Sequence, residues 1–402
     1  MAKAAFNLGA LMDDIVILGS ARTAIGTFGG ALAGLTPVEL GHIVATAALS
    51  RAGVSGDQIG TVVFGNVIAT EPADMYLSRL AAMKAGVPET VPAMNVNRLC
   101  GSGVQAIVSG VQALALGDAD FALVGGSESM SRAPYILPAA RFGQKMGDVA
   151  GIDMMLGALN CPFGTGHMGV TAENVARAYG ITRDMQDAFA LESQTRAARA
   201  ITDGHFASQI VPVSVKTRKG DVVFDTDEHP KATTADALAG LRPAFARDGS
   251  VTAGNASGIN DGAAALVLAR ASAAQKAGLR PLARITGYAH AGVRPDVMGI
   301  GPVPAVQALC ARTGLVVGDF DIIESNEAFA AQALAVSAEL GLDSQRVNPN
   351  GGAIALGHPV GASGAIITVK ALYELHRRAA KRALVTMCIG GGQGIALSLE
   401  RV

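Results

Sequence analysis

The chain has 402 residues, half of them apolar, which is enough for a large core and more than one domain. Its net charge of −1 gives no reason to expect a nucleic-acid or membrane-surface protein. The four scattered cysteines lack CxxC spacing, which argues against a disulfide framework and a zinc site and favours a reducing, cytoplasmic location.

The first dozen residues contain no apolar run long enough for a signal peptide, and we expect them to be frayed. No uninterrupted apolar run elsewhere approaches the length of a membrane span. Hydrophobic periodicity then predicts a strand at 14–20, a helix at 37–52, a strand at 61–65, a helix at 104–114 that ends at Gly117, and a strand at 121–124.

Between about 130 and 259 the composition changes. A Met-, Gly- and Pro-rich stretch comes first, and Thr182 then caps a charged helix predicted at 183–201. Residues 216–234 are polar and dense in charge. Because the segment contains a well-formed helix, we interpret it as an insertion that packs on the rest of the chain and offers ligand contacts, rather than as a linker.

The last part of the chain repeats the pattern of the first. A Gly-Ala-Ser-Gly sequence opens a helix predicted at 365–378, and an apolar strand follows at 383–387. Gly318-Asp319 precedes a strand at 321–324, as Gly56-Asp57 precedes the strand at 61–65. Alternating strands and helices with an internal duplication predict two similar α/β halves.

Two cysteines stand beside glycine-rich backbone. Cys100 lies in the segment Asn95–Gly103, before a Gly-Ser-Gly turn and the start of a helix, where free N–H groups should lower its pKa and favour the thiolate. Cys388 follows the strand at 383–387, at a strand end where α/β sheets open crevices. We interpret Cys100 as a nucleophile and Cys388 as a proton carrier, although a strand-end core cysteine is an equal alternative for Cys388.

His358 and Asn326 lie outside regular elements. His358 sits in the glycine-rich loop Asn348–Pro359, from which an imidazole can take the proton of a nearby thiol; a structural loop histidine is the alternative. Asn326 follows the strand at 321–324 and could hold a water or donate to an oxyanion. It could also cap a helix at 327–340, and the two roles are compatible.

In this combination the chain resembles the thiolases, specifically the biosynthetic β-ketothiolases of the acetyl-CoA acetyltransferase type, over about residues 13–402. The motifs that carry the resemblance are Cys100-Gly101-Ser102-Gly103, Asn326-Glu327-Ala328-Phe329, Gly357-His358-Pro359 and Cys388 to Gly394. The resemblance implies an α/β fold with two duplicated halves in a layered α-β-α-β-α core. It assigns 13–129 to the first half, completed by about 260–280, 130–259 to an inserted loop domain for CoA binding and oligomerisation, and 281–402 to the second half.

The resemblance also implies a reaction, the reversible thioester Claisen condensation of two acyl-CoA molecules to 3-oxoacyl-CoA and CoA through an acyl-Cys100 intermediate. His358 would take the proton of Cys100, and the backbone N–H groups of Cys100 and Gly390 would hold the thioester oxygen. Cys388 would remove the α-proton of acetyl-CoA, with the enolate held by His358 and a water on Asn326. Coenzyme A and acetyl-CoA are then substrates of a homotetramer that needs no metal and no tightly bound cofactor.

The ligand contacts follow from the same resemblance. Ser257, near Ala253, matches a pantetheine-contacting position, and His167-Met168 matches a motif that lines the thioester pocket of biosynthetic enzymes. Lys231 stands where many relatives have an arginine that contacts the nucleotide of CoA. Lysine keeps the positive charge but lacks the flat guanidinium of arginine. The remaining positions match apolar pocket residues, for which ordinary core is the alternative: Leu159, Phe245, Ala256, Met298 and Phe329.

Three other functions were weighed against this one. A degradative thiolase for medium or long chains shares the motifs, but commonly lacks the histidine of the His167 motif. Decarboxylating ketosynthases share the fold but use two histidines, whereas this chain pairs one histidine with a second cysteine. A non-catalytic thiolase-like lipid-binding protein would be expected to have lost Cys100, His358 or Cys388, and all three are present.

Overall fold

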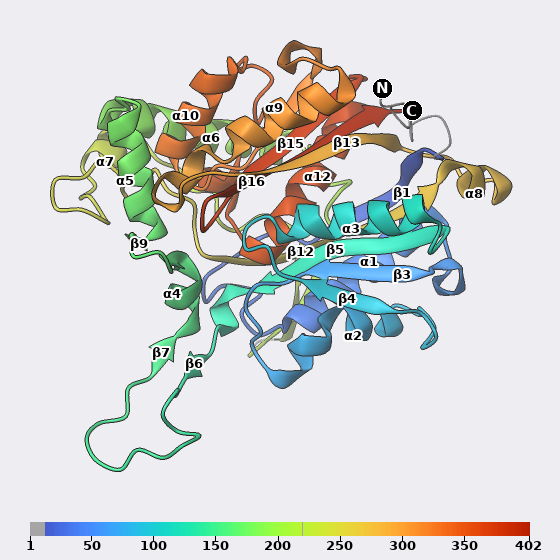
Figure 1. Cartoon of the computed structure of the whole chain (residues 1–402), viewed down its shortest axis with the longest axis horizontal. Helices are drawn as coiled ribbons and strands as arrows, with labels where there is room; N and C mark the ends of the chain where they lie inside the picture. The colour runs from blue at the N-terminus through green and yellow to red at the C-terminus, as the bar shows by residue number, and fades with distance from the viewer. Residues whose placement is uncertain (1–12, 219) are drawn as a thin grey trace, which may run out of the picture.

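The computed structural model describes residues 13–218 and 220–402, so the prediction for the first dozen residues lies outside the described part (Figure 1). The first half of the chain supplies five strands in the order β4-β3-β5-β12-β1. The strands β4, β3 and β5 run parallel, and β12 is antiparallel to both of its neighbours. Their bounds are β1 Ile15–Arg22, β3 Thr61–Gly65, β4 Ala93–Val96, β5 Phe121–Ser129 and β12 Asn260–Arg270, and a short β2, Gly26–Thr27, pairs with the start of β12.

The second half repeats this arrangement in the order β14-β15-β16-β13. Ile323 of β14 also bridges Val347 in parallel, at the position that β4 holds in the first half. Pairing between β1 and β13 joins the two halves into one ten-stranded sheet. The predicted duplication is therefore confirmed, with bounds β13 Ala283–Gly292, β14 Ile322–Ser325, β15 Arg382–Ile389 and β16 Gln393–Arg401.

Helices form layers on the strands (Figure 1). The two apolar helices α3 and α12 pack on each other, and α12 contacts strands of both halves, while α1 and α9 cover the outer faces. Turns η2 (Gly56–Gln58) and η6 (Val317–Asp319) precede β3 and β14, as the repeated Gly-Asp pairs predicted. The helices are α1 Pro37–Ala52, α2 Leu77–Lys84, α3 Ser102–Leu116, α8 Ala271–Lys276, α9 Pro302–Thr313, α10 Ala330–Leu340, α11 Ala353–Leu356 and α12 Val360–Arg377, with the turns η3 Pro72–Tyr76, η4 Met130–Arg132 and η5 Pro295–Ile300.

The contact between α3 and α12 explains their small residues. A Cβ on Gly103 would lie 2.4 Å from the backbone nitrogen of Ala365, and a Cβ on Gly364 would lie 2.4 Å from that of Val104. These glycines lie inside the two helices and let their backbones approach closely. They do not form a turn before α12, which therefore begins at Val360 rather than at the predicted 365. Leu99–Leu116 is, among the described residues, the one stretch long and apolar enough to cross a membrane by length and composition; as α3, it is packed into this interface.

The inserted segment packs beside the core and sends out an extended arm between β6 and β7 (Figure 1). Thr182 caps α6 through its side chain, as predicted. A buried pair fixes the segment to the core, because Arg22 at the end of β1 binds both carboxylate oxygens of Asp227 at 2.7 and 2.9 Å. Its elements are β6 Tyr135–Ile136, β7 Ile152–Asp153, α4 Met154–Leu159, β8 Asn160–Cys161, β9 Gly166–His167, α5 Met168–Ala178, α6 Arg183–Thr202, β10 Val213–Thr217, β11 Gly220–Phe224 and α7 Ala235–Ala239.

Candidate active site

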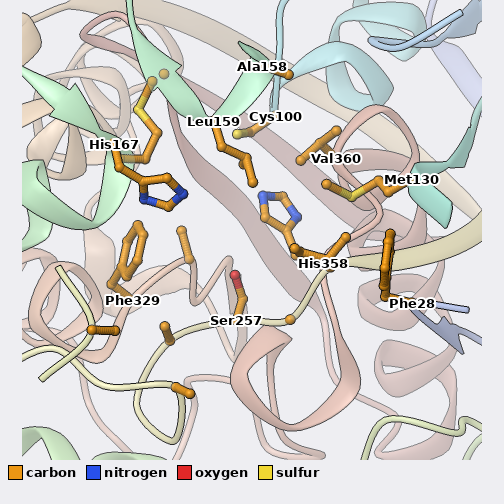
Figure 2. A pocket seen from close by; sticks show the side chains of 18 of the residues that line it. Phe28, Cys100, Met130, Ala158, Leu159, His167, Ser257, Phe329, His358 and Val360 are labelled. Atoms are coloured by element: carbon orange, nitrogen blue, oxygen red, sulfur yellow. The ribbon is translucent and has the colours of Figure 1, made fainter. Parts of the chain in front are cut away.

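A cavity of about 520 Å³ is lined by residues of both halves and of the inserted segment (Figure 2). In Figure 2, His167 and Phe329 lie on one side of Cys100 and His358, and Phe28 lies on the other. Most of the residues expected from the sequence line this cavity: Cys100, His358, Gly390, Ser257, His167, Met168, Leu159, Lys231, Phe245, Ala253, Ala256, Met298 and Phe329. Asn326 and Cys388 do not line it.

A strained turn presents Cys100 to the cavity. Leu99 has a φ of +48°, a left-handed conformation that costs a non-glycine residue on the order of 1 kcal/mol. Buried Ser102 stabilises the turn, since its hydroxyl donates to the carbonyl of Leu99 at 2.6 Å and accepts from the N–H of Arg98 at 2.9 Å. The chain therefore reverses sharply between β4 and α3, and Cys100 stands at the reversal.

Two backbone N–H groups point at the sulfur of Cys100, its own and that of Gly390, and both lower its pKa. Burial is the larger effect, however, and raises the pKa of Cys100 above its ordinary value. The prediction of a lowered pKa was therefore wrong in its net direction, because desolvation of the thiolate outweighs the hydrogen bonds. The resting nucleophile is a thiol, so it needs a base.

His358 is placed to be that base. Its Nδ1 lies 2.6 Å from the hydroxyl of Ser363, which donates to the carbonyl of Pro359 at 2.8 Å. A hydroxyl has one hydrogen, so Nδ1–H donates to Ser363 and the lone pair is on Nε2. Nε2 is buried with no partner among the described residues, and burial lowers the pKa of His358 to about 4. The imidazole is neutral and can accept a proton at Nε2.

Cys388 is the penultimate residue of β15, immediately behind the cavity wall. It belongs to a buried cluster with several residues that do line the cavity, among them Met168, Met298 and Phe329. Burial and the sulfur of Cys100 raise its pKa well above the ordinary value. The residues that follow the two cysteines are in contact, since a Cβ on Gly101 would lie 2.4 Å from Cδ1 of Ile389, so the two cysteines lie close together.

Asn326 follows β14, and its N–H donates to the carbonyl of Thr386 at 3.0 Å. The alternative role as a helix cap was wrong, because α10 begins at Ala330 and its N-cap is Phe329. Both amide atoms of Asn326 are buried without a partner in the described residues, and they line a small cavity that Ser363 also lines. Asn326 therefore borders a second, smaller cavity next to Ser363, the residue that holds the His358 ring.

Aromatic rings form the wall that the inserted segment contributes. His167 stacks on Phe245 with ring centroids 4.7 Å apart, and Phe245 meets Phe329 edge-on at 6.1 Å. The N–H of Gly169 donates to Nδ1 of His167 at 3.0 Å, which leaves Nε2 as its donor. Lys231 is exposed beside these residues. A neutral donor beside apolar rings suits the carbonyl of an uncharged acyl group.

Several cavity residues were missed by the sequence reasoning, namely Phe28, Val67, Met130, His229 and Val360. Val67 comes shortly after the strand predicted at 61–65, and Val360 begins α12, but nothing local in the sequence shows that these two positions share a cavity. His229 lies in the charge-dense stretch of the insertion, for which ligand contacts were expected without this residue being singled out. Its signal was a histidine between the acidic pair Asp227-Glu228 and Pro230, which is weak without a partner.

The arrangement supports nucleophilic acyl transfer followed by a second proton transfer. A thiol, a neutral imidazole base and two convergent backbone donors are the components of a covalent acyl intermediate. The second thiol, held protonated beside the first, can give or take one further proton. Among residues 13–218 and 220–402, no group of three or more His, Cys, Asp or Glu side chains could hold a metal ion.

Comparison with known proteins identifies two family descriptions, "Thiolase, N-terminal domain" over residues 15–272 and "Thiolase, C-terminal domain" over 279–401. The chain is 61% identical to beta-ketothiolase BktB of Cupriavidus necator, over 97% of this chain and 99% of that protein. It is 52% identical to an acetyl-CoA acetyltransferase of Escherichia coli, over 97% of this chain and 100% of that one. Human mitochondrial 3-ketoacyl-CoA thiolase in complex with CoA superposes with a TM-score of 0.95 at 43% identity, covering 98% of this chain and 99% of that one.

Proposed function

The chain belongs to the thiolase family, and from this premise we propose that it catalyses the reversible condensation of two acyl-CoA molecules to 3-oxoacyl-CoA and CoA. Acetyl-CoA or a short acyl-CoA supplies the acyl group that loads Cys100, and acetyl-CoA is the acceptor whose enolate attacks it. The observation that carries the proposal is the convergence of Cys100, the Nε2 atom of His358 and the N–H of Gly390 on one cavity, with Cys388 behind the same wall.

The first half-reaction loads the acyl group. His358 Nε2 takes the proton of Cys100, and the thiolate attacks the carbonyl carbon of acyl-CoA. The backbone N–H groups of Cys100 and Gly390 stabilise the oxyanion, the bond to the CoA sulfur breaks, and the CoA thiolate takes the proton from His358. Because one thioester replaces another, the step is nearly isoenergetic and reversible.

The second half-reaction forms the carbon–carbon bond. Cys388 passes its proton to His358, which is neutral again once CoA has left, and the Cys388 thiolate removes the α-proton of a second acetyl-CoA. The enolate attacks the carbonyl of acyl-Cys100, and the released Cys100 sulfur takes the proton from His358. Raising the pKa of Cys388 makes its thiolate a stronger base for this weakly acidic proton. In thiolysis the same high pKa keeps Cys388 protonated and ready to reprotonate the leaving enolate.

A preference for short acyl chains is part of the proposal. The stacked rings of His167, Phe245 and Phe329 occupy one side of the cavity, and the relatives with the highest identities include a beta-ketothiolase and several acetyl-CoA acetyltransferases. Asn326 contributes through a water in this proposal, since it lines a neighbouring small cavity and not the main one. We further propose a cytoplasmic location and a homotetramer.

Steady-state thiolysis of 3-oxoacyl-CoA substrates of increasing chain length tests the function. We expect acetoacetyl-CoA to be cleaved with the highest or nearly the highest kcat/KM, and the Cys100→Ser and Cys388→Ser variants each to lose at least about a thousandfold in kcat. Cys310→Ser, which changes a thiol on α9 outside the cavity, is the matched control and should keep wild-type kcat. Full activity in Cys388→Ser would contradict the proposed proton transfer.

A further inference from the structure

Three segments that line the cavity meet on one buried side chain, Asn260, the first residue of β12. Its Oδ1 accepts from the backbone N–H of His358 at 2.9 Å. Its Nδ2 donates to the carbonyl of Gly26 at 3.0 Å and lies 3.3 Å from Nδ1 of His229. Asn260 thus connects the loop of the catalytic base to a histidine of the inserted segment.

These contacts determine which nitrogen of His229 carries the proton. A backbone N–H can only donate and a backbone carbonyl can only accept, so the amide of Asn260 has one possible orientation. Its Nδ2 must then donate to Nδ1 of His229, which leaves the ring hydrogen on Nε2. Burial, with a smaller effect of Lys231, lowers the pKa of His229 to about 4, so the ring presents one uncharged N–H at neutral pH.

His229 helps to form the wall of the ligand cavity, as does Gly258. A Cβ on Gly258 would lie 2.2 Å from Cε1 and 2.8 Å from Nε2 of His229, so the Nε2 edge of the ring rests on Gly258. The side chain of the preceding residue, Ser257, is also in the cavity wall (Figure 2). Nε2 has no hydrogen-bond partner in the described part of the chain, although Nδ1 is held by Asn260.

We propose that His229 is a ligand-binding residue that donates from Nε2 to an amide carbonyl oxygen of the pantetheine arm of acyl-CoA. This rests on the proposed function, which supplies the ligand. The arm carries two amides and reaches from the thioester toward the outside of the cavity. An uncharged donor on the wall beside Ser257 matches a neutral carbonyl, whereas the phosphates of CoA would favour the exposed cation of Lys231, two residues further along the chain.

The test compares two thioesters with three variants. Acetoacetyl-CoA and acetoacetyl-pantetheine share both amides, but only the first carries the nucleotide and its diphosphate. His229→Leu removes the donor, and His229→Gln returns an N–H at similar reach. His42→Leu is the matched control, since His42 lies on α1, is bonded to Thr46 and does not line the cavity.

We expect His229→Leu to lower kcat/KM about tenfold for both thioesters, mainly through KM, because one hydrogen bond to the ligand is lost. His229→Gln should recover most of this loss, and His42→Leu should match wild type. An unchanged kcat/KM in His229→Leu, a loss confined to acetoacetyl-CoA, or no recovery in a folded His229→Gln protein would overturn the inference.

Binding separates this inference from the proposed reaction. Calorimetric titration with CoA and with S-acetylpantetheine measures the contact between His229 and the pantetheine arm without turnover. We expect the affinity of His229→Leu for both ligands to be roughly tenfold weaker than that of wild type. Wild-type protein that binds both but does not cleave acetoacetyl-CoA would refute the function alone. Equal affinities of wild type and His229→Leu would refute the role of His229 alone.

Discussion

Cys100 and His358 rest as a neutral pair. Burial raises the pKa of the thiol and lowers that of the imidazole to about 4, so both groups are uncharged at neutral pH. Ser363 holds the His358 ring with Nε2 toward the cavity, and Asn260 holds its backbone. The proton of Cys100 therefore moves to His358 only after the ligand has bound. The negative charge that then develops on the carbonyl oxygen of the ligand is stabilised by the N–H groups of Cys100 and Gly390.

Alkylation of Cys100 by iodoacetamide measures this resting state. Because the pKa of Cys100 lies above the ordinary 9.0, we expect the alkylation rate to keep rising with pH through about pH 9. Peptide mapping by mass spectrometry assigns the label to Cys100, and the Cys100→Ser variant gives the background. A rate that levels off below about pH 7 would show a thiolate–imidazolium pair and contradict this description.

The candidate residues at the site could be found from local sequence, whereas their electrostatics could not. A cysteine before a Gly-Ser-Gly turn and a histidine in a glycine-rich loop are visible motifs, and both residues line the cavity. The direction of the Cys100 pKa depends on how much protein surrounds the sulfur, which comes from strands and loops hundreds of residues away. His229 was missed for the same reason, because its partner Asn260 is distant in sequence.

Glu128, on β5, joins elements from the two halves. Its carboxylate accepts from the N–H groups of Val67 and Ile68 and the amide of Asn66, all after β3, and from the N–H of Gly361 in the first turn of α12. The four partners are all donors. Burial raises the pKa of Glu128, whereas the N–H donors lower it by stabilising the carboxylate. The residue holds Val67 beside the start of α12, where both segments border the cavity.

Glu128→Gln tests this connection. The amide NH₂ of glutamine would face N–H donors, leaving buried donors unpaired at a cost of roughly 1–3 kcal/mol each. We therefore expect a Tm several degrees below that of wild type in thermal unfolding followed by circular dichroism. Glu89→Gln, at an exposed position, is the control and should leave Tm unchanged. A wild-type Tm in Glu128→Gln would mean that the carboxylate is not needed for this contact.

Most elements of the core could be predicted because their periodicity is local. The bounds of α1 agree with the prediction, and α3 ends at Gly117, with φ +83°. The start of α12 was misplaced, because its glycines serve contact with α3 rather than a turn. Pairing of β1 with β13 had no local signal, since strand partners in a duplicated fold are set by long-range packing.

At the scale of the molecule, the duplicated halves bring Cys100, His358 and Cys388 together, and the inserted segment closes the cavity over them. The arm between β6 and β7 is different, because its large apolar side chains point into solvent. Phe142 is 89% exposed and Met146 is 87% exposed. Apolar side chains gathered on an extended arm are typical of a protein–protein contact.

The arm provides a test of the proposed homotetramer. We expect size-exclusion chromatography with light scattering to give four times the chain mass for wild type, and a smaller assembly for the Phe142→Asp, Met146→Asp double variant. Arg141→Asp, a charge change on the same arm, controls for altered electrostatics. A monomeric wild type, or a double variant that remains tetrameric, would contradict the assignment of the arm to assembly.

Mass spectrometry of the acetylated protein tests most directly whether Cys100 carries the acyl group while Cys388 transfers the proton. After brief incubation with acetyl-CoA, we predict an acetyl group on the peptide containing Cys100 in wild type and in Cys388→Ser, and none in Cys100→Ser. Cys388→Ser should accumulate this adduct, because it loads the acyl group but cannot generate the enolate that consumes it. An acetyl group on Cys388 in the wild type, or undiminished labelling in Cys100→Ser, would contradict the mechanism.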